Sequence, residues 1–130
     1  MILVFGGAYQ GKLDYAKENF HIEKVYDCRE AGELAGDAIL PDFSADAVCG
    51  LEAFVSVCEK QGVEAAELFR ENRELWRDKV LIIRDQSQGV VPVDAGQRTA
   101  REMNGRLMIY LASEADEVHR VFCGIGKRIK

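Results

Sequence analysis

The chain opens with Met1-Ile2-Leu3-Val4-Phe5-Gly6-Gly7-Ala8-Tyr9-Gln10-Gly11-Lys12-Leu13-Asp14-Tyr15, an apolar run of strand length followed by a glycine-rich turn. The turn ends in Gly-Lys, where helical spacing of apolar residues begins. This is the layout of a phosphate-binding loop, or P-loop: backbone N–H groups point at a phosphate, the helix N-terminus adds its dipole, and the lysine reaches the outer phosphates. The sequence therefore predicts an anion site formed by Gly6, Gly7, Ala8, Tyr9, Gln10, Gly11, Lys12 and Leu13.

Two residues at the end of this loop, Leu13 and Asp14, argue against a bound metal ion. A P-loop has Ser or Thr after its lysine, and that hydroxyl binds magnesium, whereas this chain has Leu13. Asp14 follows in the first turn of the helix, where its charge suits the helix dipole of an empty site but repels a triphosphate. Both residues favour weak or metal-independent anion binding, so no metal site is predicted and a role for Mg²⁺ is doubtful.

Composition and charge narrow the class of protein. A chain of 130 residues with 48% hydrophobic and 30% charged residues fits one folded domain spanning 1–130. The net charge of -5 argues against nucleic-acid and membrane-surface partners, which need a surplus of Lys and Arg. The four cysteines lack metal-site spacing, and we expect them to be small buried residues. No secretory or membrane-spanning pattern is evident, which makes the cytoplasm the expected compartment.

The remaining sequence alternates strand and helix patterns. Predicted strands follow the first at Glu23–Asp27, Gly36–Leu40, Lys79–Arg84 and Asp116–Gly124. Predicted helices cover Lys12–Asn19, Ala45–Gln61, Val63–Arg77 and Asp94–Glu114. Five strands separated by helices predict a mainly parallel α/β sheet with helices on both faces, a three-layer sandwich like that of P-loop NTPases. Trp76 is expected in the core as a lid.

Two aspartates are candidates for catalysis together with Lys12. Asp42 follows the third predicted strand and Asp85 the fourth, and ligands of such sheets bind at the carboxyl ends of the strands. Asp42 is the candidate for ordering a magnesium ion or its water. An aspartate that caps or turns a loop accounts for Asp42 equally well.

Short motifs at both ends of the chain recur together in one enzyme family. The first part contains Ile2-Leu3-Val4, Gly6-Gly7-Ala8, Gly11-Lys12 and Ala16. The second runs without a gap from Val80 to Lys130 and contains Gly89-Val90-Val91-Pro92, Arg98, Arg101, Gly105-Arg106, Leu111-Ala112, Ala115-Asp116-Glu117-Val118, Gly124 and Ile129-Lys130. On these motifs the chain resembles the adenosylcobinamide kinase / adenosylcobinamide-phosphate guanylyltransferase family of cobalamin biosynthesis. The middle resembles it only at Asp37-Ala38-Ile39-Leu40.

The resemblance implies GTP or ATP as nucleotide, a corrinoid substrate and a homo-oligomer. The chain departs from the family at the positions that carry out the family's reactions. The family has Ser-Gly-Lys-Ser in its loop, against Gln10-Gly11-Lys12-Leu13 here. Its later Asn-Glu, Pro-Glu-Asn and helix Asn are replaced by Arg84-Asp85, Pro92-Val93-Asp94 and Met108. Family members are longer, and the length missing here includes the histidine that is guanylylated. His21 and His119, the two histidines of this chain, do not match its position.

Three interpretations follow from these patterns. The first is a degenerate family member that binds a nucleotide or phosphate with weak or no catalysis, a pseudoenzyme. The second is an active adenosylcobinamide kinase without the guanylyltransferase step, because that step needs a histidine in reach. The third is purely structural: the glycines serve the turn, and Lys12 pairs with an acid such as Asp85. Titration with GTP and ATP, with and without magnesium, distinguishes them.

Overall fold

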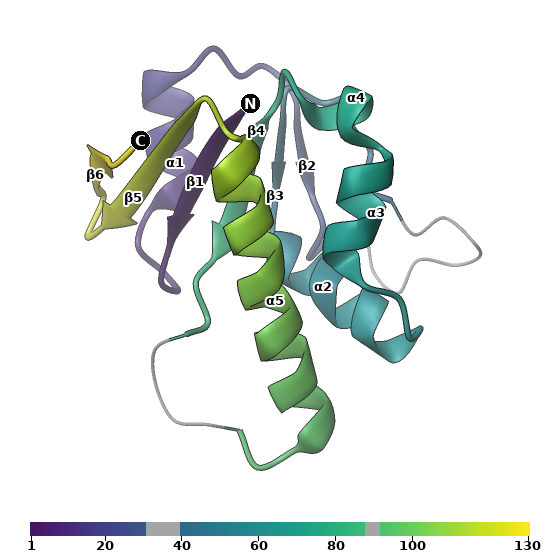
Figure 1. Ribbon diagram of the computed structural model, residues 1–130. Coiled ribbons are helices and arrows are strands. Elements are labelled where there is room, and N and C mark those ends of the chain that lie inside the picture. The colour runs from purple at the N-terminus through teal and green to yellow at the C-terminus, as the bar shows by residue number, and fades with distance from the viewer. Residues whose placement is uncertain (31–39, 88–91) are drawn as a thin grey trace.

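The computed structural model describes residues 1–30, 40–87 and 92–130, and the described part forms a twisted sheet with helices on both faces (Figure 1). The strands are β1 (Ile2–Gly6), β2 (Val25–Asp27), β3 (Ala47–Cys49), β4 (Val80–Arg84), β5 (Glu117–Phe122) and β6 (Ile125–Arg128). They form a six-stranded sheet in the order β2-β3-β4-β1-β5-β6. All neighbouring pairs are parallel except β5 and β6, which are antiparallel.

The helices divide unequally between the two faces. They are α1 (Lys12–Asn19), α2 (Leu51–Lys60), α3 (Ala65–Glu71), α4 (Arg73–Trp76) and α5 (Ala95–Glu114). The chain moves along the sheet in one direction from β1 to β2 and in the other direction afterwards. Because crossovers between parallel strands are right-handed, this reversal places α1 on one face and α2 to α5 on the other. The α/β class with a mainly parallel sheet is thus confirmed.

Each face of the sheet has its own apolar core. On the face of α2 to α5, the core includes Leu3, Leu81, Ile83, Phe54, Phe69, Trp76 and Leu107. On the face of α1, it includes Val4, Ile82, Val121 and Ala16. Burial on both faces explains why β1 and β4 are continuous apolar runs rather than alternating ones. The structure confirms that Trp76 belongs to the core: its side chain is buried, and its indole N–H donates to the Phe69 carbonyl oxygen at 2.8 Å.

The predicted helix Ala45–Gln61 begins too early. Residues Ala47–Cys49 form strand β3, and α2 starts only at Leu51. Gly50 separates them with φ 70°, a left-handed conformation that ends the strand and that glycine adopts without steric cost. The earlier predicted strand Gly36–Leu40 lies outside the described residues except for Leu40, which is in a bend.

Three further predictions need correction. Val63–Arg77 is two helices, α3 and α4, because the backbone of Asn72 leaves the helical conformation (φ -120°, ψ 30°). The described part has six strands, of which four match predicted ones; the two that were not predicted are β3 and β6, and β6 forms because the chain turns back after β5. The turn residues Cys123 and Gly124 have φ 51° and 75°, the paired positive values of a tight hairpin. Cys123 is consequently exposed, contrary to the expectation of buried cysteines, whereas Cys49 and Cys58 are buried and Cys28 is half-buried.

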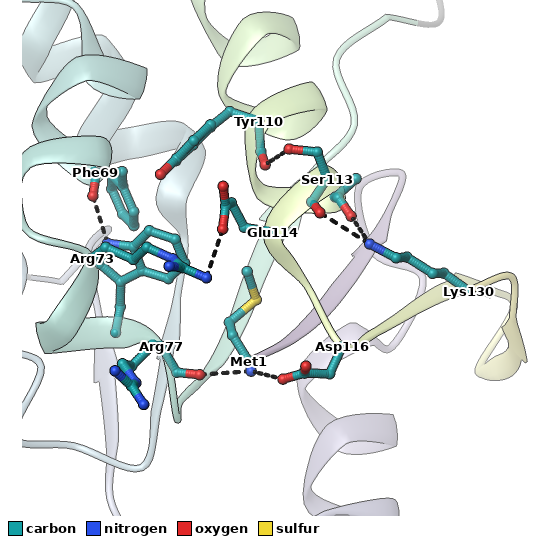
Figure 2. Close-up of polar contacts among 11 residues, drawn as sticks. Met1, Phe69, Arg73, Arg77, Tyr110, Ser113, Glu114, Asp116 and Lys130 are labelled. Atoms are coloured by element: carbon teal, nitrogen blue, oxygen red, sulfur yellow. Dashed lines mark hydrogen bonds and ion pairs between the residues drawn. The ribbon is translucent and has the colours of Figure 1, made fainter.

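Polar contacts gather near the end of α5 and involve Met1 before β1 and Lys130 after β6 (Figure 2). The amino group of Met1 donates to the Arg77 carbonyl oxygen at 2.7 Å and to Asp116 Oδ2 at 2.6 Å. Lys130 Nζ donates to the carbonyl oxygens of Ala112 and Ser113, which the last turn of a helix leaves without partners. These contacts fix the C-terminal end of α5 at the amino edge of the parallel strands, opposite the glycine-rich loop. Within the described part of the chain, no helix is both long and apolar enough to cross a membrane.

Candidate anion-binding site

The glycine-rich loop connects the carboxyl end of β1 to the N-terminus of α1, as the sequence predicts. The Gly6 carbonyl oxygen accepts a hydrogen bond from the backbone N–H of Asp85 at 2.8 Å, which joins the loop to the end of β4. Gly11 precedes the helix with φ 79° and contributes no side-chain cap. The first N–H groups of α1 therefore have no side-chain acceptor, and the positive end of the helix is available to an anion.

Lys12 folds back onto the loop rather than pairing with Asp85. Its Nζ donates to the Gly7 carbonyl oxygen at 2.7 Å. Burial lowers the pKa of this ammonium; Glu52 opposes the shift, and nearby arginines add to it. The lysine is thus held within the loop, with donor capacity left for a phosphate oxygen because an ammonium has three N–H groups.

The turn between β5 and β6 supports the loop through Gln10. The backbone carbonyl oxygen of Gln10 accepts from the Gly124 N–H at 2.8 Å, and its side-chain Oε1 accepts from the Cys123 N–H at 2.6 Å. Gln10 stands where the resembled family has a serine. Sequence reasoning missed this contact because it did not include β6. The exposed neighbour Tyr9 has φ 57°, a conformation in which non-glycine residues are uncommon.

The loop does not fit a protein-bound magnesium ion. Leu13 packs against the apolar cluster under α1 and has no oxygen to offer. Within the described ranges, no group of three or more His, Cys, Asp or Glu side chains is placed to hold a metal. Magnesium needs oxygen ligands, and Leu13 cannot supply the one that a P-loop hydroxyl would give.

The structure brings Asp85 to the loop but not Asp42. Asp85 follows β4 directly and its Oδ1 accepts from the Ser87 N–H at 2.8 Å. Asp42 Oδ1 accepts from the Ser44 N–H at 2.9 Å, and its Oδ2 lies 4.0 Å from Lys24 Nζ, just before β2 begins. Asp42 therefore precedes β3 and lies at the amino edge of the sheet, opposite the loop. The expectation that it gathers with the loop is wrong, and its contacts are those of a loop-turning aspartate.

A buried acid that sequence reasoning missed lies close to Lys12. Glu52 is only 8% exposed, and its Oε1 accepts from the Arg84 N–H at 3.0 Å. Glu52 is in the first turn of α2, whose preceding residue Gly50 also provides no side-chain cap. The sequence did not indicate Glu52 as a site residue because the predicted helix Ala45–Gln61 placed it in the middle of a helix. In the structure it is near the start of α2.

Two cavities adjoin the loop. The smaller, about 270 Å³, is lined by Gly11, Lys12, Leu13, Arg29, Gly50 and Glu52 among others. The larger, about 810 Å³, lies at the carboxyl end of β4 between α2 and α5, and the loop residues Gly7 and Ala8 form part of its wall. Both lie at the carboxyl edge of the parallel strands, where α/β proteins bind their ligands.

Neither histidine lies at these cavities. His21 follows α1, at the end remote from the loop, and its side chain is 90% exposed beside Glu23. His119 is buried in β5, where Nδ1 lies 2.9 Å from the Tyr15 hydroxyl and Nε2 lies 3.2 Å from Glu117 Oε1. Its register partner is Val4, in the middle of β1. The expectation that neither imidazole can reach a phosphate on the loop agrees with these positions.

Comparison with known proteins gives no family for this chain: no family model matches the sequence, and no curated protein matches it.

Proposed function

We propose that the chain binds a nucleotide, GTP or ATP, or inorganic phosphate on the loop Gly6–Lys12, with weak or no catalysis. The observation that carries this proposal is the loop itself: a glycine turn from the carboxyl end of β1, an uncapped start of α1, and Lys12 held beside them. Backbone N–H groups, a helix dipole and an ammonium together favour phosphate. The family motifs extend the proposal to a degenerate relative of the adenosylcobinamide kinase / guanylyltransferase enzymes, acting in the cytoplasm in connection with cobalamin biosynthesis as a homo-oligomer.

An active adenosylcobinamide kinase is the less favoured alternative. Phosphoryl transfer depends on positioning and on neutralising charge around the transferred phosphate. Here Leu13 replaces the hydroxyl ligand, and Asp42 lies at the opposite edge of the sheet. Asp85 remains near the loop as the one predicted acid that could orient an acceptor hydroxyl. A corrinoid is proposed as the second ligand in either case, on the motifs alone.

Lys12→Met is expected to weaken GTP and ATP binding about ten-fold or more, because it removes charge-assisted hydrogen bonds to the phosphates. Isothermal titration calorimetry of the full chain in EDTA measures the change. Lys17→Met is the matched control: Lys17 is an exposed lysine in the last turn of the same helix. Equal affinities for the Lys12 variant and the unmodified chain would contradict the proposed role of the loop.

Nucleotide affinity of the unmodified chain is expected to be the same in Mg²⁺ and in EDTA, because Leu13 offers the ion no ligand. Leu13→Ser adds the missing hydroxyl and is expected to give a magnesium-dependent gain of about ten-fold at most, since Asp42 is too remote to help. Leu13→Ala separates the hydroxyl from the loss of the apolar side chain. Tight, magnesium-dependent binding by the unmodified chain would refute the degenerate-site proposal and favour the kinase.

A further inference from the structure

The larger cavity lies at the point where the chain topology reverses. The connection after β1 goes to α1 on one face, and the connection after the adjacent strand β4 goes to α5 on the other face. The carboxyl ends of two such strands leave a crevice between them, which is where open α/β sheets hold their ligands. Gly7 and Ala8 after β1, and Arg84 to Gln86 at the end of β4, line the 810 Å³ cavity. Topology alone therefore directs a ligand to it.

Size distinguishes the two cavities beside the loop. Pockets that enclose organic ligands measure about 300–1,000 Å³. The cavity of about 270 Å³ falls below this range. It is lined by Lys12, whose ammonium suits a phosphoryl group. The cavity of about 810 Å³ is well within it, and the loop contributes backbone on that side. A phosphate on the loop thus leaves an adjoining space large enough for the rest of an organic phosphate.

The wall of the larger cavity has polar side chains with unused hydrogen-bonding capacity. Asp85 and Asp94 accept from backbone N–H groups, so part of their capacity is spent locally. Glu59 and Lys60 at the end of α2, and Gln97 in α5, line the cavity without a side-chain hydrogen bond or ion pair to any described residue. The cavity wall therefore offers both hydrogen-bond donors and hydrogen-bond acceptors. Such a mixed lining suits a ligand group that is polar but uncharged better than it suits an ion.

A buried acceptor lies directly behind this wall. Asn104 Nδ2 donates to the carbonyl oxygen of Arg84, a wall residue, at 3.0 Å. Asn104 is 1% exposed and its Oδ1 has no hydrogen-bond partner within the described ranges. It is one helical turn beyond the lining residue Ala100. An unpaired buried acceptor is costly, and a water or ligand donor at the base of the cavity would satisfy it.

We propose that the cavity between α2 and α5 holds the nucleoside portion of a nucleotide whose phosphates lie on the loop, with Glu59 as an acceptor that determines specificity. This proposal rests on the proposed function. It adds the position of the nucleoside and the residue, Glu59, that distinguishes one nucleoside from another. Glu59 accepts from the N–H or O–H groups of the base or sugar, and Lys60 and Gln97 complete the set of contacts. The interaction is binding only and involves no covalent step.

The test separates phosphate contacts from nucleoside contacts by comparing tripolyphosphate with ATP and GTP in EDTA, by calorimetry on the full chain. At least one nucleotide is expected to bind about ten-fold more tightly than tripolyphosphate, because only the nucleotide fills the cavity. Glu59→Ala is expected to remove most of this advantage while leaving tripolyphosphate affinity unchanged. Glu71→Ala, an exposed acid at the end of α3, is the matched control. Backbone amide NMR shifts of Gly96 and Gln97 should change with the nucleotide and not with tripolyphosphate.

Each other outcome has a definite meaning. Binding of tripolyphosphate with no tighter binding of either nucleotide would overturn the inference and leave phosphate binding on the loop intact. An equal loss of tripolyphosphate and nucleotide affinity in Glu59→Ala would also overturn it, since Glu59 would then act on the loop. If neither ligand type binds the unmodified chain, both the inference and the proposed function fail.

Discussion

Replacing Gly6 with alanine is expected to lower the free energy of unfolding by about 3 kcal/mol, because the added Cβ would lie 2.3 Å from the Val121 carbonyl oxygen. That oxygen is backbone in the adjacent strand β5 and cannot rotate away as a side chain would. Relief of the clash requires β1 and β5 to separate at the base of the loop. Anion binding should also weaken, because movement of β1 away from β5 displaces the Gly6 carbonyl oxygen. That oxygen accepts the Asp85 N–H and so joins the loop to β4.

Gly105→Ala is the matched control for this substitution. Gly105 is in the interior of α5, and a Cβ added there meets nothing within 4 Å. Alanine should stabilise the helix by about 0.5–1 kcal/mol relative to glycine. The two glycine-to-alanine changes are thus expected to have opposite signs in urea unfolding followed by far-UV circular dichroism. A Gly6 variant as stable as the unmodified chain would show that the close approach of β1 to β5 is wrong.

The strands and helices that are long and regular could be predicted from the sequence. The first strand, the loop and α1 are defined by an apolar run, glycines and the Gly-Lys junction, and the structure places all three there. β4 is apolar from Val80 to Ile83, as expected of a strand buried on both faces, and ends in Arg84. The long helix α5 begins after Asp94, whose side chain accepts from the Gln97 N–H and caps it.

The errors occur where local patterns are ambiguous. Ala47–Cys49 is short, fully buried and next to a true helix, so its apolar residues fit helical spacing as well as a strand. β6 contains Gly126 and two cations in four residues, a composition that gives no strand signal. It forms because the Cys123-Gly124 turn returns the chain alongside β5. Gly126 leaves room for the ring of Tyr15, which occupies the position where a side chain would project.

The candidate site was predictable only in part. The loop and Asp85 follow from strand order, because each comes directly after a central strand. Asp42 was assigned to the wrong edge of the sheet because a strand was expected before it, whereas the described strand β3 comes after it. The cavity between α2 and α5 requires side chains from three segments far apart in sequence, including Glu59 and Gln97. No local pattern reports such a convergence, and it becomes apparent only from the packing of the two helices.

Replacing Trp76 with alanine is expected to lower the free energy of unfolding by about 3–5 kcal/mol, the usual cost of removing a large buried aromatic side chain. Trp76 is 1% exposed and joins α4 to both neighbouring helices: its ring centroid is 5.7 Å from that of Phe69 and 6.0 Å from that of Tyr110. Phe69 in turn packs on Phe54 of α2 at 5.5 Å. Loss of the indole therefore weakens the support of α2 and α5, the two helices that line the larger cavity.

Two further variants separate packing from hydrogen bonding at this position. Trp76→Phe retains most of the apolar contact but removes the N–H that donates to the Phe69 carbonyl oxygen, so a smaller loss of about 1–2 kcal/mol is expected. Leu75→Ala, at the adjacent and 45% exposed position, should cost under about 1 kcal/mol. Because Trp76 is the only tryptophan, unfolding must be followed by circular dichroism rather than by indole fluorescence. Equal losses for Trp76→Ala and Leu75→Ala would contradict the buried position of the indole, since an exposed ring has little packing to lose.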